Sequence, residues 1–122
     1  MIQNIDITGV HVEVGNDLKK YITKKIGRLD RFIPKKDRAS ARAEVKLKEA
    51  STKKKKQYLC EVIIHLPHGK ITTKETTINM FAAVDIVETK LKNQLKKYKE
   101  THSVLRGHTR RLISKFQSRQ SR

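Results

Sequence analysis

The sequence predicts an α+β fold with the element order β-α-β-β-β-α, in which two helices pack side by side on one face of a four-stranded sheet. Three observations lead to this prediction. Segments 18–32 and 79–99 carry apolar residues at helical spacing. Other segments alternate apolar and polar residues, as strands with one buried face do. Finally, Pro67-His68-Gly69 supplies a turn between the last two strands. The helix-covered face of such a sheet must be apolar, and the opposite face is expected to be polar and open to water.

The first strand and the first helix are predicted from residues 2–8 and 18–32. Ile5 and Ile7 alternate with polar residues, which indicates a strand with one buried face. Pro34 stops the helix, because a proline ring clashes with the preceding turn and lacks an N–H. The apolar stripe of this helix consists of Leu18, Ile22, Ile26, Leu29 and Phe32.

The other three strands are predicted at 38–48, 57–66 and 70–77, with the last two paired as an antiparallel hairpin. The lysine-rich loop 51–56 cannot pack and is expected to be mobile. In the second strand, one face carries Ala39, Ala41, Ala43, Val45 and Leu47, and the other carries Arg38, Ser40, Arg42, Glu44, Lys46 and Lys48. In the third strand, the residues expected to face the core are Tyr58, Cys60, Val62, Ile64 and Leu66.

The second helix is predicted to begin at Asn79, whose side chain is suited to accept a hydrogen bond from a first-turn N–H. Its apolar stripe consists of Phe81, Val84, Leu91, Leu95 and Tyr98. At about 100° per residue, lysines fall on both flanks of this stripe. Lys90 and Lys97 lie on one flank, and Lys92 and Lys96 on the other.

The composition changes after Lys99, which predicts a folded domain at 1–100 and a basic flexible tail at 101–122. The tail contains six Lys and Arg residues, no acidic residue and only scattered apolar ones. Such a segment orders on a partner, if at all. At 122 residues one folded domain is expected, without a dimerisation domain of its own.

The charge of the chain predicts a polyanionic partner. Against 12 Asp and Glu there are 29 Lys and Arg, a formal net charge of +17. Nucleic acid is the first candidate, an anionic membrane surface the second and an acidic protein the third. No apolar run is long enough for a membrane span. The single cysteine, Cys60, fits a reducing, cytoplasmic environment.

No pattern in the sequence points to an enzyme, a metal site or a cofactor. His65 and His68 flank a Pro-containing turn without a second ligand pair, which is a weak metal signal, and Cys60 lies on the apolar side of its strand. The carboxylates are scattered, and no glycine-rich phosphate loop is present. No small-molecule substrate is therefore expected.

The functional signal is a pair of helices that are apolar on one side and basic on the other. In the first helix, Lys20, Lys24, Arg28 and Arg31 share one side, and Lys25 lies beside the apolar stripe. In the tail, Arg106, Arg110 and Arg111 are spaced to meet phosphates along an extended path. Such a surface suits a protein that tracks an RNA backbone rather than reading base edges.

These segments resemble the bacterial ribosome hibernation-promoting factor family, which includes the ribosome-associated inhibitor. The resemblance is carried by N-M-F-A-A-V-D at 79–85 and K-L-K-N-Q-L-K-K-Y-K at 90–99, with support from I-T-G-V-H-V-E-V at 7–14 and Y-I-T-K-K-I-G-R-L-D-R-F at 21–32. It covers about residues 1–100, and the chain is similar to short members. Long members carry a further domain that dimerises ribosomes, and short inhibitor-type members have an acidic tail end where this tail is basic.

The resemblance implies binding to rRNA phosphates, and neighbouring proteins, of the small ribosomal subunit, in the channel where messenger RNA and tRNA would lie. Asn93 stands where the family often has a basic residue, and Lys92 or Lys96 can supply that charge. From the first helix and the second, the implied RNA-facing residues are Lys25, Arg28, Lys90, Asn93 and Lys97. The full candidate set is Lys20, Lys24, Lys25, Arg28, Arg31, Lys90, Asn93, Gln94, Lys97, Arg106, Arg110 and Arg111.

The expected function is reversible inhibition of translation in stressed or stationary-phase cells, by occupation of the messenger channel. Two alternatives stay open at this point. One is a general structured-RNA-binding protein of the double-stranded-RNA-binding type, which also packs two helices on a small sheet. The other is a regulator that binds an acidic protein partner.

Overall fold

The protein's structure, a computed structural model, describes residues 1–104, with side chains to residue 101. The predictions for the rest of the tail, including Arg106, Arg110 and Arg111, fall outside the described residues. Within them the element order is β1 (Asn4–Val10), α1 (Asn16–Gly27), η1 (Arg28–Phe32) and η2 (Lys35–Ser40), both 3₁₀ helices, β2 (Arg42–Glu49), β3 (Tyr58–Leu66), β4 (Gly69–Thr77) and α2 (Met80–Val104).

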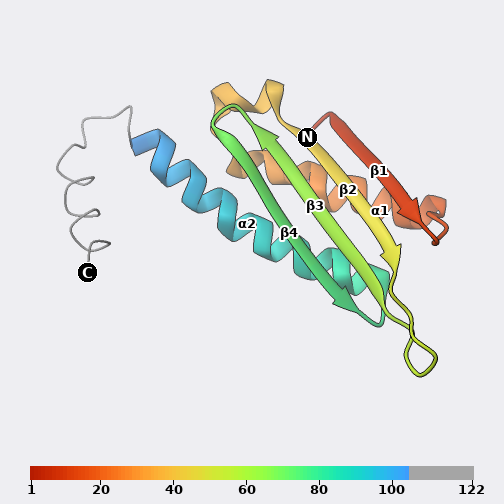
Figure 1. Ribbon diagram of the computed structural model, residues 1–122. Coiled ribbons are helices and arrows are strands. Elements are labelled where there is room, and N and C mark those ends of the chain that lie inside the picture. The colour runs from red at the N-terminus through yellow and green to blue at the C-terminus, as the bar shows by residue number, and fades with distance from the viewer. Residues whose placement is uncertain (105–122) are drawn as a thin grey trace, which may run out of the picture.

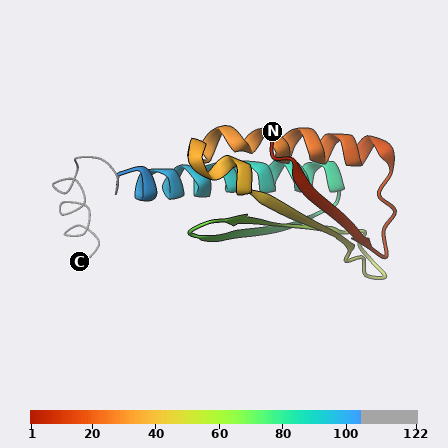
Figure 2. The same cartoon turned by 90° about the horizontal axis from the view of Figure 1, so that it is seen from above.

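The four strands form one sheet in sequence order, β1-β2-β3-β4. β1 pairs with β2 in parallel, while β2–β3 and β3–β4 are antiparallel. Leu66 pairs with Gly69, so Pro67 and His68 form the predicted tight turn, and Gly69 has a φ of 146° that favours glycine. Both helices lie side by side on one face of the sheet, as Figure 1 and Figure 2 show together. The predicted fold class is confirmed.

The core lies between the helices and the sheet. In the sheet, Val45 pairs with Val62, and both side chains are buried against the helices. Each fully buried aliphatic side chain contributes about 1.5–3 kcal/mol. Cys60 is buried as predicted, and burial raises the pKa of its thiol to about 12, so the thiol stays protonated and inert. The largest fully buried side chains are Ile22, Ile26, Leu29, Ile33, Val45, Leu47, Val62, Ile64, Val84, Val87, Leu91 and Leu95.

The connection between α1 and β2 differs from the prediction. The α-helix ends at Gly27, and its stripe continues through η1 to Phe32. Beyond Pro34 a second 3₁₀ helix, η2, replaces the predicted start of the strand, so Ala39 is exposed rather than inward-facing. Alternating alanines did not reveal this, because alanine suits a helical turn as well as a strand.

Helix α2 begins as predicted but its buried face is rotated. The side chain of Asn79 accepts hydrogen bonds from the N–H groups of Phe81 at 2.8 Å and Ala82 at 3.3 Å. Phe81, predicted to be in the core, is 41% exposed, whereas Val87 is fully buried. The sheet therefore lies under a stripe centred on Val84, Val87 and Leu91, with Phe81 at its edge. The helix continues to Val104, past the predicted boundary at 100, and no helix within 1–104 is apolar enough over sufficient length to cross a membrane.

Candidate nucleic-acid interface

The candidate interface is the helix seam, the line along which α1 and η1 meet α2 on the side away from the sheet. Tyr21 contacts Phe81 and Asp85, Lys25 contacts Asp85 and Glu88, and the ring of Phe32 is approached by cations from α2. The residue numbers rise together on both sides, so the two helices run in the same direction. The seam therefore begins at the contact between the rings of Tyr21 and Phe81 and ends at the cations around Phe32.

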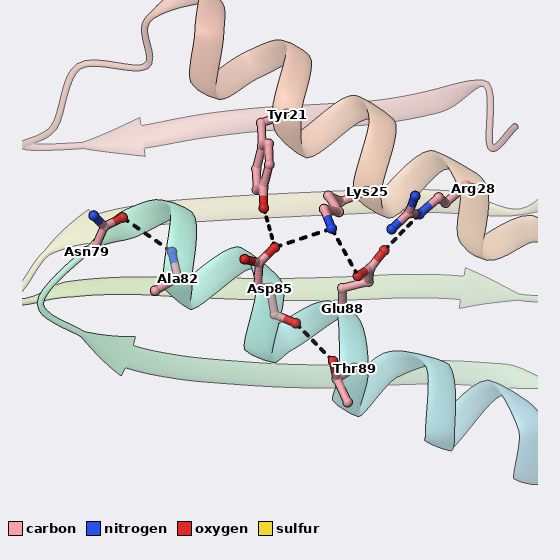
Figure 3. A network of polar contacts seen from close by, with 8 residues as sticks. All are labelled: Tyr21, Lys25, Arg28, Asn79, Ala82, Asp85, Glu88 and Thr89. Carbon is pink, nitrogen blue, oxygen red and sulfur yellow. Dashed lines mark hydrogen bonds and ion pairs between the residues drawn. The ribbon is translucent and has the colours of Figure 1, made fainter.

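The seam centre, defined as Tyr21, Lys25, Arg28, Asp85 and Glu88, is a charge-balanced network (Figure 3). Lys25 Nζ lies 3.6 Å from Asp85 Oδ1 and 3.8 Å from Glu88 Oε1. Arg28 Nε donates to Glu88 Oε2 at 3.0 Å, and the hydroxyl of Tyr21 donates to Asp85. Two cations and two carboxylates thus cross-link the helices, each pair contributing up to about 1 kcal/mol because all four groups are partly exposed.

Tyr21 is fixed as a hydrogen-bond donor by this network. Its hydrogen bond to Asp85, together with some burial and the negative charges of Asp85 and Glu88, raises the pKa of Tyr21 to about 12. The phenol consequently stays protonated at neutral pH. On its other side the Tyr21 ring meets the ring of Phe81 edge to face, with centroids 5.1 Å apart, which accounts for the position of that exposed phenylalanine.

The far end of the seam is the Phe32 cluster, defined as Arg31, Lys92 and Lys96 around the ring of Phe32. Arg31 Cζ lies 5.2 Å from the ring centroid, and the Nζ atoms of Lys92 and Lys96 lie 5.5 Å and 5.7 Å from it. These distances are those of cation–π contacts. Among the side chains of residues 1–101, none within 4.0 Å forms an ion pair with any of the three cations.

The structure places the sequence-predicted residues on three different surfaces. Lys25, Arg28 and Arg31 belong to the seam. Lys20 and Lys24 are exposed on α1, beside a surface depression that Met1, Asn16, Lys19 and Thr23 also line. On the flank of α2 that faces β4, Lys90 pairs with Glu75 and Gln94 accepts a hydrogen bond from Thr73 at 3.0 Å, while Asn93 and Lys97 are exposed.

Sequence reasoning did not find the carboxylates of the seam or its aromatic rings. Asp85 and Glu88 lie on the polar side of a helix and read there as ordinary solvated charges. The two carboxylates are three residues apart, which puts them on one side of the helix together with Lys92. This spacing could have indicated that they act together. Which flank meets α1 depends on how the helices pack, and the two lysine flanks look alike in sequence.

The residues considered for a metal site are engaged in other ways. His65 Nε2 lies 3.0 Å from Glu44 Oε2, on the face of the sheet opposite the helices, and this contact lowers the pKa of the Glu44 carboxyl. Cys60 points to the opposite, buried side of the same strand. No group of three potential metal ligands occurs among the described residues.

Comparisons with known proteins agree with this architecture. The model of the family described as "Sigma 54 modulation protein / S30EA ribosomal protein" matches residues 5–103. The ribosome hibernation promoting factor of Pseudomonas putida is 31% identical over 104 residues, which are 84% of this chain and 94% of that protein. The ribosome hibernation promotion factor of Lactococcus lactis subsp. cremoris is 33% identical over 94 residues, 77% of this chain and 48% of that protein. The chain thus spans about half the length of this second relative.

A solved structure shows the same fold. The crystal structure of the N-terminal domain of Thermus thermophilus Protein Y superposes with a TM-score of 0.68 and 28% sequence identity, covering 79% of this chain and 99% of that domain. The order of strands and the helix pair described above therefore recur in a relative of known structure.

Proposed function

The chain belongs to the Sigma 54 modulation protein / S30EA ribosomal protein family, and on this premise we propose that it is a ribosome hibernation factor of the cytoplasm. In this proposal it binds the small ribosomal subunit in the messenger channel at the decoding site. It excludes messenger RNA and tRNA by overlap and so inhibits translation reversibly. No bond is made or broken.

The observation that carries the proposal is the basic helix pair on the outer side of the fold. The segment that forms α1 and η1 contains six Lys and Arg residues and two carboxylates, and α2 contains five and three. Both helices lie on the same face of the sheet (Figure 2), so that side of the fold carries a surplus of positive charge. A broad basic surface with few exposed aromatic rings suits phosphate contacts along folded RNA rather than base stacking.

The names of the relatives support the ribosome as the polyanionic partner in this proposal. The P. putida relative, which this chain matches over 94% of its length, is named for ribosome hibernation. In this proposal rRNA phosphates line the messenger channel, so a basic surface that enters the channel would contact several of them. The tail residues Arg106, Arg110 and Arg111 are proposed to follow the messenger path, and neighbouring ribosomal proteins are proposed as further contacts.

Sedimentation and competition test this function. Purified protein should co-sediment with small subunits through a sucrose gradient, and added messenger RNA with initiator tRNA should displace it. In a lysate of stationary-phase cells, the endogenous protein should travel with ribosomal particles. If it stays at the top of the gradient there, the hibernation proposal is wrong. Equal affinity for naked duplex RNA and for subunits would instead favour the general structured-RNA binder.

A further inference from the structure

We propose that the Phe32 cluster, rather than the seam centre, is the principal phosphate-binding site of the helix pair. The ligand is a backbone phosphate of folded RNA. The inference rests on the proposed function, because it names the residues through which the helices would hold rRNA. It changes the assignment for Lys25 and Arg28, which the resemblance implies as RNA-facing residues.

The geometry gathers three cations from two elements onto one aromatic ring. Arg31 comes from η1, and Lys92 and Lys96 come from α2, one turn apart on the same side of that helix. All three charged groups lie between 5.2 and 5.7 Å from the centroid of Phe32. The negative face of the ring restricts where the cations sit, which reduces the conformational entropy lost when they close on an anion.

The carboxylates of the adjoining stretch 28–40 are occupied elsewhere. Asp30 Oδ2 lies 2.8 Å from the N-terminal ammonium of Met1. Asp37 is 3% exposed and accepts a hydrogen bond from the Tyr98 hydroxyl at 3.2 Å. Like charges held close together repel one another, so the cluster has a positive potential that a polyanion relieves.

The turn that carries the cluster is itself held in place by a fourth cation. Arg38 Nε donates to the carbonyl of Ile33 at 3.0 Å, and its Nη2 donates to the carbonyl of Arg31 at 3.4 Å. These bonds close the backbone around Phe32 and keep the guanidinium of Arg38 beside it. The site therefore has a fixed backbone, and Arg31 supplies a planar fork that matches two phosphate oxygens.

The seam centre lacks these properties. A phosphate approaching Lys25 or Arg28 meets Glu88, which lies within 4 Å of both cations, and at Lys25 it also meets Asp85. It must either break those ion pairs or sit beside two negative charges. Lys90 is likewise paired, with Glu75. Cations whose charge is already balanced release fewer counterions from RNA than cations without a partner, and so contribute less to affinity.

A pair of matched triple variants of the full chain tests the inference. The first replaces the cluster cations: Arg31→Gln, Lys92→Gln and Lys96→Gln. The control removes the same charge from the opposite face of the sheet: Lys46→Gln, Lys48→Gln and Lys74→Gln, all exposed. Affinity for purified small subunits, and for a labelled rRNA hairpin, is measured between 0.05 and about 0.3 M salt, with melting temperature as the folding control.

The cluster variant should bind subunits and hairpin about 100-fold more weakly at about 0.1 M salt, with a slope of log affinity against log salt reduced by about 2 to 3. The sheet-face variant should lose less than about tenfold. Equal losses in both variants, or no loss in the cluster variant, would overturn the inference while leaving the proposed function intact. If the wild type binds the hairpin but not subunits, the proposed function fails and the hairpin data decide the inference. If the wild type binds neither, both are wrong.

Discussion

The seam centre and the Phe32 cluster lie one helical turn apart and are built from the same kinds of side chain, yet their charges differ. In the centre, Lys25 and Arg28 meet Asp85 and Glu88, and the result is a cross-link between helices. At Phe32 three cations contact an aromatic ring, and no carboxylate among the side chains of residues 1–101 forms an ion pair with them. The cations on one basic helix face therefore have two different roles. Those of the seam centre stabilise the packing of the helices, and those of the Phe32 cluster are available to bind a partner.

Both regions depend on one packed core, and its disruption should have the largest effect. Leu91 is fully buried below the seam, between Glu88 and Lys92 in sequence. Leu91→Ala should lower the free energy of unfolding by about 2–5 kcal/mol, because the lost side chain leaves a cavity. Chemical denaturation measures this. Asn93→Ala, an exposed neighbour, should change it by less than about 0.5 kcal/mol; equal effects would mean that the assignment of helix faces is wrong.

Double variants of each region should separate stability from binding. Lys25→Ala with Arg28→Ala should lower the free energy of unfolding by about 1–2 kcal/mol, because Glu88 loses both of its cationic partners and Asp85 loses Lys25. Lys92→Ala with Lys96→Ala should change it by less than about 0.5 kcal/mol, because mutual repulsion is relieved as the contacts with Phe32 are lost. The same denaturation assay applies. A larger loss of stability in the second variant would reverse the comparison.

Removal of one carboxylate charge should give the seam centre a net positive charge, as the Phe32 cluster has. Glu88→Gln removes the negative charge that lies 3.0 Å from Arg28 Nε. RNA affinity should then rise about three- to tenfold at about 0.1 M salt, with a steeper salt dependence, because about one more cation contacts phosphate. Titration of the labelled hairpin measures this. Affinity that falls in the variant would show that Glu88 holds Arg28 in its RNA-binding position.

The smallest expected effect is a pH dependence at the aromatic end of the seam. The pKa of Tyr21 is raised to about 12 in the folded protein, first by its hydrogen bond to Asp85. A raised folded-state pKa means that the stabilisation is fully present below the ordinary value of about 10 and is lost as pH rises toward 12. The stability difference between wild type and Tyr21→Phe should therefore be constant from pH 7 to about 9.5 and shrink above it. A difference that persists at pH 12 would contradict this account.

Local patterns were sufficient for most of the fold. The Asn79 cap and the strand positions of Val62 and Ile64 follow from neighbours within a few residues. The exposure of Phe81 could not be predicted from the sequence. Apolar spacing locates the buried stripe of a helix only to within one residue on either side, and the position of Phe81 at the edge of the stripe depends on its contact with Tyr21.

The candidate site was predictable only as a set of cations. Arg28 and Glu88 are 60 positions apart in sequence, and nothing local couples them. Their pairing depends on the direction and rotation of two helices on the sheet. The same rotation turns Lys92 and Lys96 toward Phe32 and Lys90 toward Glu75. Sequence therefore indicates how much positive charge the helices carry, whereas packing decides which of it is neutralised.

The length of α2 has a consequence for motion. Among side chains through residue 101, Leu95 is the last that is buried, although the helix runs on to Val104 and extends past the edge of the sheet (Figure 1). Residues 99–101, which follow Tyr98, are exposed, so water reaches the helical turn that they form. Amide protons there should exchange with solvent much faster than those near Leu91, since helix ends fray far more readily than the domain unfolds. A molecule that binds this end of α2 in its helical conformation would shift the equilibrium between frayed and helical states toward the helix.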